Sequence, residues 1–322
     1  MPHVMEPPTG SVDEAGETLR TVEVAGRRLA VRSRVEQPEG LPPALYVHGL
    51  GGSSQNWSEL MEVLADRVYG EALDLPGFGH SEPPADGDYS VTGHARAVIR
   101  YLEASGRGPV HLFGNSLGGA VATRVAALRP DLVRTLSLVS PALPELRPQR
   151  SALPTALLAV PGAPRLYARL TRGWTAERRT REVMALCYGD PGGVRPEGFA
   201  RAVAEYERRL GLPYFWEVMA HSARGVVNAY TVGGQHSLWR QAERVIAPTL
   251  LVYGGRDRLV APRMAGRASR AFRDSRLLFL PEAGHVAMME HPKTVAGAFL
   301  DMAGTAGEAS ETAGVEAHRG TP

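Results

Sequence analysis

Residues 114–119 read GNSLGG and lie between an apolar run, 109–113, and a run of small and apolar residues, 120–128. This order predicts a strand, a sharp turn and a helix, with Ser116 on the turn. It is the context that the G-x-S-x-G nucleophile elbow requires. Glycines on both sides of the serine are favoured because a Cβ atom there would collide with the neighbouring strand and helix. Ser116 is therefore the candidate nucleophile.

Two later segments supply partners for a serine nucleophile. Residues 247–257 read as a buried strand that ends in a glycine turn carrying Asp257. Residues 275–280 read as another strand, which leads into a loop that ends in His285. The chain order Ser116, Asp257, His285 is that of the α/β-hydrolase triad and differs from the orders in the chymotrypsin and subtilisin classes. Glu145, the first carboxylate after the expected sixth strand, is the rival for the acid.

Four motifs in order give the chain its family resemblance. They are HGLGG at 48–52, DLPGFGHS at 74–81, the serine elbow, and the Gly-His pair at 284–285. On these motifs residues 22–302 resemble the α/β-hydrolase superfamily. The resemblance implies a mostly parallel, doubly wound, eight-stranded sheet with a helical cap inserted after the sixth strand. In such sheets the ligand site lies beyond the carboxyl ends of the strands, where every one of these motifs falls.

Apolar runs that alternate with helical patterns support the same α/β fold class. The expected strands are 19–24, 29–35, 45–47, 68–73, 110–113, 135–139, 249–253 and 277–280. After residue 141 the alternation stops, and the pattern predicts helices and loops until about residue 240. The predicted organisation is a flexible segment at 1–18, a core at 19–141 and 241–302, a helical cap at 142–240, and a disordered tail at 303–322.

Composition narrows the function classes. The 322 residues are 43% hydrophobic and 22% charged, with a net charge of +2, so no strong field for nucleic acid or for an anionic membrane is expected. The single cysteine, Cys187, excludes an intramolecular disulfide and reads as a structural thiol. The arginines at 147–181 read as a solvated helical surface. Without a signal-peptide pattern or an apolar run of about 18 residues, the chain is expected to be cytoplasmic, with no transmembrane segment. The oligomeric state stays open.

The resemblance also assigns roles around the serine. His285 would act as general base, and Asp257 would orient its imidazole. The oxyanion of the tetrahedral intermediate would be held by the backbone N–H groups of Leu50 and Leu117. The substrate pocket is expected to include Asn115, Trp216 and Val286. The histidine of motif 48–52 and the acid and serine of motif 74–81 are expected to be structural.

The sequence therefore predicts a serine hydrolase that cleaves a carboxylic ester of small or medium acyl chain through an acyl-Ser116 intermediate. The expected partner is a small ester-like substrate, not nucleic acid. No cofactor and no metal are expected, because no HExxH, Cys-x-x-Cys or phosphate-binding glycine loop is present. Three alternatives stay open: a meta-cleavage-type carbon–carbon hydrolase, which usually has tryptophan where Val286 stands; an acyltransferase or perhydrolase on the same triad; and a ligand-sensing protein of the same fold.

Overall fold

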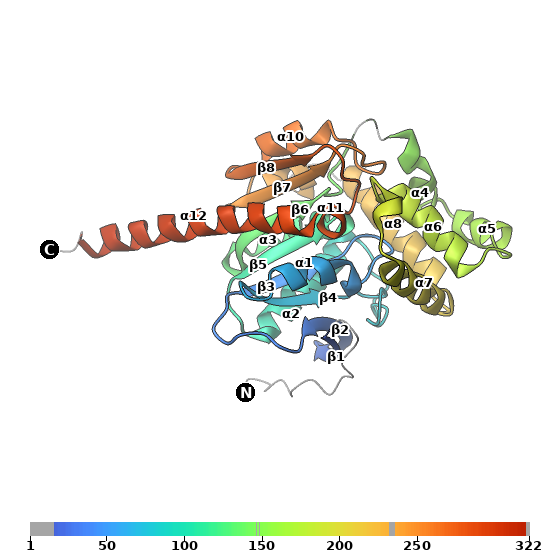
Figure 1. Cartoon of the computed structure of the whole chain (residues 1–322), viewed down its shortest axis with the longest axis horizontal. Helices are drawn as coiled ribbons and strands as arrows, with labels where there is room; N and C mark the ends of the chain where they lie inside the picture. Colours follow the sequence, from blue (N-terminus) through green and yellow to red (C-terminus); the bar gives the residue numbers. More distant parts are fainter. Residues whose placement is uncertain (1–15, 146, 148, 232–235, 320–322) are drawn as a thin grey trace.

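The computed structural model describes residues 16–145, 147, 149–231 and 236–319, and it contains one sheet of eight strands (Figure 1). The strand order is β1-β2-β4-β3-β5-β6-β7-β8. β1 and β2 pair antiparallel, β2 joins β4 antiparallel, and the remaining pairs are parallel. The strands are β1 Glu17–Val24, β2 Arg27–Arg34, β3 Pro43–Val47, β4 Tyr69–Leu73, β5 Val110–Asn115, β6 Val133–Val139, β7 Thr249–Gly254 and β8 Ser275–Leu280.

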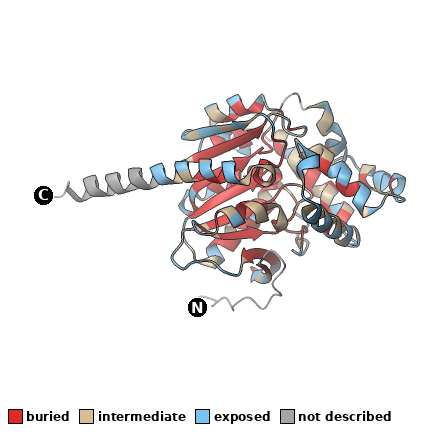
Figure 2. Cartoon of the chain, in the orientation of Figure 1, coloured by how far each residue is buried: buried red, intermediate tan, exposed pale blue. Residues whose placement is uncertain are grey.

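Helices cover both faces of the sheet, because the parallel strands are apolar on both sides. Along β3, Leu45 belongs to one hydrophobic cluster and Tyr46 to the other, as the period of two requires. The first cluster takes in helices α2 (Val91–Ser105), α3 (Leu117–Leu128), α9 (Leu238–Ala242) and α10 (Met264–Ala271). The second takes in η1 (Ser54–Trp57), α1 (Ser58–Val63), α11 (Ala287–Glu290) and α12 (Pro292–Arg319). Figure 2 shows the strands buried between these layers.

Between β6 and β7 the described residues form helices and loops only, as the sequence predicts. These inserted helices gather on one side of the molecule in Figure 1. α9 crosses the predicted boundary at residue 240, and it packs against α3 with Leu238 and Trp239 in the first core cluster. A short helix, η2 (Pro130–Leu132), precedes β6 and lies outside the insertion. The inserted elements before α9 are η3 Arg150–Ala152, α4 Leu153–Leu157, α5 Ala163–Leu170, α6 Ala176–Cys187, η4 Pro191–Gly193, α7 Pro196–Leu210 and α8 Phe215–Thr231.

Both ends of the chain differ from the sequence-based expectation. The predicted flexible segment ran to residue 18, but Glu17 and Thr18 begin β1 and are buried; residues 1–15 lie outside the described part. The predicted disordered tail began at residue 303, but α12 continues to Arg319; residues 320–322 are not described. Alanine and glutamate favour helix, so the tail's lack of apolar anchors does not prevent this local structure. Within the described ranges, no helix is both long and apolar enough to cross a bilayer.

Candidate active site

Ser116 occupies the sharp turn between β5 and α3. Its backbone has φ 54° and ψ −115°, a strained conformation for a residue with a side chain. The end of the neighbouring strand β3 passes so close that a Cβ on Gly118 would lie 2.2 Å from the carbonyl oxygen of Val47. A Cβ on Gly114 would likewise lie 2.4 Å from the carbonyl oxygen of Gly118. These contacts explain why glycines flank the serine at these positions.

Asp257 and His285 lie close together in the loops that follow β7 and β8. His285 Nδ1 is 2.9 Å from Asp257 Oδ2, and both side chains are buried. The other carboxylate oxygen accepts hydrogen bonds from the backbone N–H groups of Leu259, at 2.8 Å, and Val260, at 2.9 Å. An ionised carboxylate can only accept, so the imidazole donates from Nδ1 and leaves Nε2 free to take a proton.

The Asp257 carboxylate is held in its ionised form. Burial by itself raises the pKa of a carboxyl group. The charge of His285, its hydrogen bond and the backbone donor of Val260 act in the opposite direction and together lower the pKa of Asp257 below its usual value. The aspartate is therefore built to stabilise a positive charge on the imidazole.

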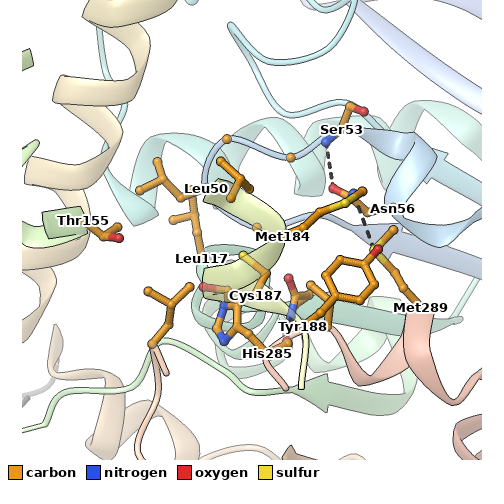
Figure 3. A pocket seen from close by; sticks show the side chains of 18 of the residues that line it. Leu50, Ser53, Asn56, Leu117, Thr155, Met184, Cys187, Tyr188, His285 and Met289 are labelled. Atoms are coloured by element: carbon orange, nitrogen blue, oxygen red, sulfur yellow. Dashed lines mark hydrogen bonds between the residues drawn. The ribbon is translucent and has the colours of Figure 1, made fainter. Parts of the chain in front are cut away.

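Ser116 and His285 line the same cavity, which has a volume of about 350 Å³. Its wall combines core residues with residues of the inserted helices. In Figure 3, Leu117 and His285 come from the core, whereas Met184 and Cys187 come from α6. Most of the wall is apolar, which suits a pocket that binds the apolar part of a small molecule.

Asn115 stands behind the serine and holds two other loops. Its side-chain amide donates to the carbonyl oxygens of Val139, at 3.1 Å, and His285, at 3.0 Å. The side chain is buried, although the residue reaches the cavity wall. Asn115 thus links the elbow to the end of β6 and to the histidine loop. Its position before the serine is visible in the sequence, but its partner 170 residues away is not.

The end of α6 is fixed against the histidine loop. The backbone N–H of His285 donates to the carbonyl oxygen of Cys187 at 2.6 Å. Glu290 accepts from the N–H groups of Gly284 and Gly189, each at 2.7 Å. Burial, with lesser effects from nearby acids, raises the pKa of the Cys187 thiol to about 12, so the thiol stays protonated and unreactive. The inserted segment therefore touches the loop that carries His285.

His48 fixes the turn at 48–52. The backbone N–H of Leu75 donates to His48 Nε2 at 3.0 Å, so the ring proton sits on Nδ1 and is donated to the carbonyl oxygen of Gly49 at 2.7 Å. Gly52 N–H also donates to this oxygen. Burial lowers the pKa of His48, which keeps the ring neutral. Because C=O and N–H point in opposite directions across a trans peptide, the N–H of Leu50 faces away from these donors.

Two consecutive arginines of α7 bind the loops of the core. Arg209 donates to the carbonyl oxygen of Gly51, in the same turn that His48 fixes from below. Arg208 donates to the carbonyl oxygen of Gly79 at 2.9 Å. Buried Glu205 accepts two hydrogen bonds of 2.8 Å from Arg208 and lies 3.5 Å from Arg209. No sequence pattern indicates the two contacts with Gly51 and Gly79, because each joins residues more than 100 positions apart.

The loop at 74–81 is held by two hydrogen bonds within the loop and two to neighbouring segments of the core. Asp74 accepts from the backbone N–H of Ser54 at 2.6 Å and of His80 at 2.9 Å. The Ser81 hydroxyl donates to the carbonyl oxygen of Asp74 at 2.6 Å and accepts from the N–H of Ala30 at 2.8 Å. All four bonds are internal to the core, which agrees with the structural role expected for this motif.

The other predicted site residues fall in different places. Leu50, Leu117 and Val286 line the cavity. Trp216 is not among the described residues of its wall; it packs edge-on against Tyr167 and Phe215, with ring centres 5.5 and 5.0 Å apart. An aromatic residue on an amphipathic helix can face either way, and here it faces neighbouring helices.

Glu145 reaches the cavity but forms an ion pair with Arg263. Among the described residues, the carboxylate that bonds to His285 is Asp257. The same part of the chain holds no cluster of three histidine, cysteine, aspartate or glutamate side chains arranged as metal ligands.

A protein-family model described as alpha/beta hydrolase fold matches residues 42–292. The chain belongs to this family. The predicted fold and the predicted class of enzyme, an α/β-fold hydrolase, are both confirmed. The match begins just before β3 and ends at the start of α12, so it spans the serine elbow and both partner loops.

The relatives of this α/β hydrolase are named for different reactions. The chain is 27% identical to a pimeloyl-[acyl-carrier protein] methyl ester esterase of Neisseria meningitidis, over 84% of this chain and 96% of the relative. It is 28% identical to the dihydrolipoyllysine-residue acetyltransferase component of the acetoin cleaving system of Cupriavidus necator, over 78% of this chain and 60% of that relative. Among solved structures, the 2-hydroxy-6-oxo-6-phenylhexa-2,4-dienoate hydrolase of Rhodococcus sp. RHA1 has a TM-score of 0.69 at 20% identity, covering 88% of this chain and 99% of the other. This structural likeness shows the fold.

Proposed function

We propose that the chain is a serine hydrolase that cleaves carboxylic esters of small or medium acyl chain through an acyl-Ser116 intermediate. The observation that carries the proposal is the buried pair of His285 and ionised Asp257, with His285 on the wall of the cavity that also contains Ser116. The esterase name of the Neisseria relative, which matches 84% of this chain, supports the ester as the substrate class.

In the proposed mechanism, His285 Nε2 takes the proton from the Ser116 hydroxyl as the serine oxygen attacks the ester carbonyl carbon. The imidazolium that forms lies against the Asp257 carboxylate, which stabilises its charge and keeps the ring in orientation. His285 then gives the proton to the departing alcohol. A water molecule, activated by the same imidazole, hydrolyses the acyl-serine and restores the free hydroxyl.

We assign the oxyanion donors to the backbone N–H groups of Leu50 and Leu117. Leu117 is the first residue of α3, so its N–H is one of those that a helix start leaves without an intrahelical partner. The dipole of α3 adds partial positive charge at the same place. The N–H of Leu50 is directed by the bonds that His48 and Gly52 make to the preceding carbonyl oxygen. Both leucines line the cavity.

Residues 142–240 act, in this proposal, as a cap over the site. Their helices supply a large part of the cavity wall, including Met184 from α6, Tyr206 from α7 and Val226 from α8. A closed apolar wall excludes water from the acyl group and strengthens the electrostatic interactions within. A volume of about 350 Å³ lies at the small end of the range for ligand pockets, which favours short and medium acyl chains.

A series of p-nitrophenyl esters from acetate to palmitate tests the proposal. We expect turnover with an optimum at short or medium chain length, and covalent labelling of Ser116 by a fluorophosphonate. Folded protein that neither turns over any ester nor takes up the probe would rule out the serine esterase. Rapid cleavage of a vinylogous diketone with poor ester turnover would replace it with the carbon–carbon hydrolase. Acyl esters or peracids formed when alcohol or peroxide is added would indicate acyl transfer or perhydrolysis.

Arg209 offers a separate prediction, because it binds the carbonyl next to the assigned oxyanion donor. The change Arg209→Met removes the bond to Gly51 and loosens the turn, so we expect kcat to fall about 10-fold to 100-fold, less than for complete loss of an oxyanion donor. KM should change by less than kcat. Steady-state kinetics on the preferred ester will measure both constants.

Arg201 is the matched control, because it lies on the same helix and on the same cavity wall but pairs with Glu59 at 3.8 Å. Arg201→Met should leave kcat within a few-fold of the unaltered enzyme. Arg209→Lys, which keeps a cation, should recover part of the loss. Equal losses in Arg201→Met and Arg209→Met would contradict the role given to Arg209.

A further inference from the structure

The charge of the chain is distributed unevenly. The net charge of the whole chain is +2, but residues 146–176 contain no aspartate and no glutamate. The same segment has arginines at positions 147, 150, 165, 169 and 172. It includes α4 and α5 of the cap. The average charge therefore hides a local basic segment.

Apolar side chains in this segment are exposed. Leu157 is 57% exposed, Leu166 58% and Leu170 73%. On α5 the exposed leucines alternate with exposed arginines, since Arg165 and Arg169 each precede one of them. We use the name outer cap face for a set of five exposed apolar residues: Leu153, Leu157, Val160, Leu166 and Leu170.

The outer cap face points away from the rest of the molecule. α4 and α5 both pack against α8, so their opposite sides are turned outward. Tyr167 packs edge-on against Trp216 of α8, and Arg224 of α8 donates a hydrogen bond to the carbonyl oxygen of Ala159, between α4 and α5. In Figure 1, α5 lies at the edge of the molecule farthest from α12, and Figure 2 shows its outer surface exposed. α5 is therefore open to a partner that approaches this edge of the molecule.

We propose that the outer cap face docks on an anionic lipid bilayer, with α5 lying in the plane of the headgroups. An interfacial helix of this kind places leucines at the acyl boundary and cations beside the lipid phosphates. Leu166 and Leu170 would be the leucines at the acyl boundary. The cations beside the phosphates would be Arg165, Arg169 and Arg172. Residues 146–176 hold no carboxylate, so no negative side chain within this segment opposes an anionic surface, and the exposed Glu177 that follows it forms an ion pair with Arg181.

The same charge pattern argues against a second copy of the chain as the partner. A two-fold interface brings a patch against itself, and here it would place arginines against arginines with no acid in the segment to neutralise them. A bilayer supplies both the apolar phase and the negative charge.

The docking surface lies next to the candidate active site. Leu153 and Leu157 of α4 are half-exposed, whereas Thr155 and Ala156 of the same helix line the cavity. Docking therefore brings one wall of the cavity to the lipid surface. An ester dissolved in the membrane would meet the cavity without crossing bulk water.

Vesicle sedimentation tests the proposal without any substrate, so its result does not depend on the proposed esterase activity. We expect the full chain to bind vesicles of phosphatidylglycerol and phosphatidylcholine about 100-fold more tightly than vesicles of phosphatidylcholine alone, since about three arginines contact the charged surface. Added salt should weaken this preference. The double variant Leu166→Ser, Leu170→Ser should reduce binding about 10-fold on both vesicles.

The triple variant Arg165→Gln, Arg169→Gln, Arg172→Gln should lose the preference for anionic vesicles. The matched control is the triple variant Arg67→Gln, Arg134→Gln, Arg270→Gln. It removes the same charge from exposed surface positions outside the cap, and it should keep the preference for anionic vesicles. Equal losses in the two triple variants, or no binding to anionic vesicles, would overturn the proposal. The proposal would also be overturned by a dimer in solution that the Leu166→Ser, Leu170→Ser variant dissociates. Binding of an acidic protein to this face in place of vesicles would overturn it as well. Thermal unfolding midpoints confirm that each variant is folded.

Discussion

Ser116→Ala is expected to lower kcat for the preferred ester by about 10⁶-fold, by analogy with other serine triads. Alanine keeps the backbone of the elbow but removes the hydroxyl oxygen that is proposed to form the acyl intermediate. Residual turnover over the uncatalysed reaction should persist, because the assigned backbone donors and the cavity remain. The measurement is kcat on p-nitrophenyl esters, with labelling by a fluorophosphonate as a second readout.

His285→Ala should lower kcat by a similar factor, and the double variant should be no worse than either single variant, because the two residues act as a unit. The strained φ of 54° belongs to the turn, so both variants should keep the fold. A Ser116→Ala enzyme that retains a tenth of the original kcat would show that the nucleophile lies elsewhere. Mass spectrometry of the labelled peptide would then locate it.

Asp257→Asn is expected to lower kcat by about 10⁴-fold. The amide has a donor where the carboxylate has an acceptor, so it favours the wrong tautomer of His285 and cannot stabilise the imidazolium. Glu145→Gln is the matched control, because this rival acid pairs with Arg263 and not with the histidine. Its kcat should stay within a few-fold. Normal turnover in Asp257→Asn together with loss in Glu145→Gln would reverse the assignment.

The same aspartate makes the free energy of unfolding depend on pH. The pKa of Asp257 is lowered in the folded chain, because its interactions with His285 and the backbone outweigh burial. A carboxyl group of this kind contributes stability above its unfolded pKa, about 3.9, and the contribution is lost as the pH falls through the lower folded pKa. The stability difference between the unaltered chain and Asp257→Asn should therefore shrink below about pH 4. Denaturant unfolding at several pH values will measure it.

The sheet and the three candidate catalytic residues could be predicted because their signals are local. Each strand is a short apolar run, Ser116 follows such a run directly, and Asp257 and His285 lie in the loops just after two others. Parallel strands bring their carboxyl ends to one edge of the sheet, so residues far apart in the chain are placed together by topology. The fold prediction is confirmed, whereas the catalytic roles stay predictions that the variants above will test.

The parts that could not be predicted depend on contacts between distant segments. Trp216 lies on a helix whose apolar residues can face the cavity or neighbouring helices, and spacing does not choose between them. The amide of Asn115 could be placed beside the serine but not opposite the carbonyl of His285. The segment 303–319 contains alanines and glutamates that favour helix locally, and this preference acts without apolar anchors.

The arginine pair of α7 couples the position of this helix to the turn that holds Leu50. Arg209 donates a hydrogen bond to the carbonyl oxygen of Gly51, and Arg208 donates one to that of Gly79. One turn of α7 is therefore bonded to two loops of the core. A movement of α7 away from the core would break both hydrogen bonds and free the backbone beside Leu50, which is proposed as an oxyanion donor. In the proposed mechanism, stabilisation of the transition state would therefore depend on α7 being docked against the core.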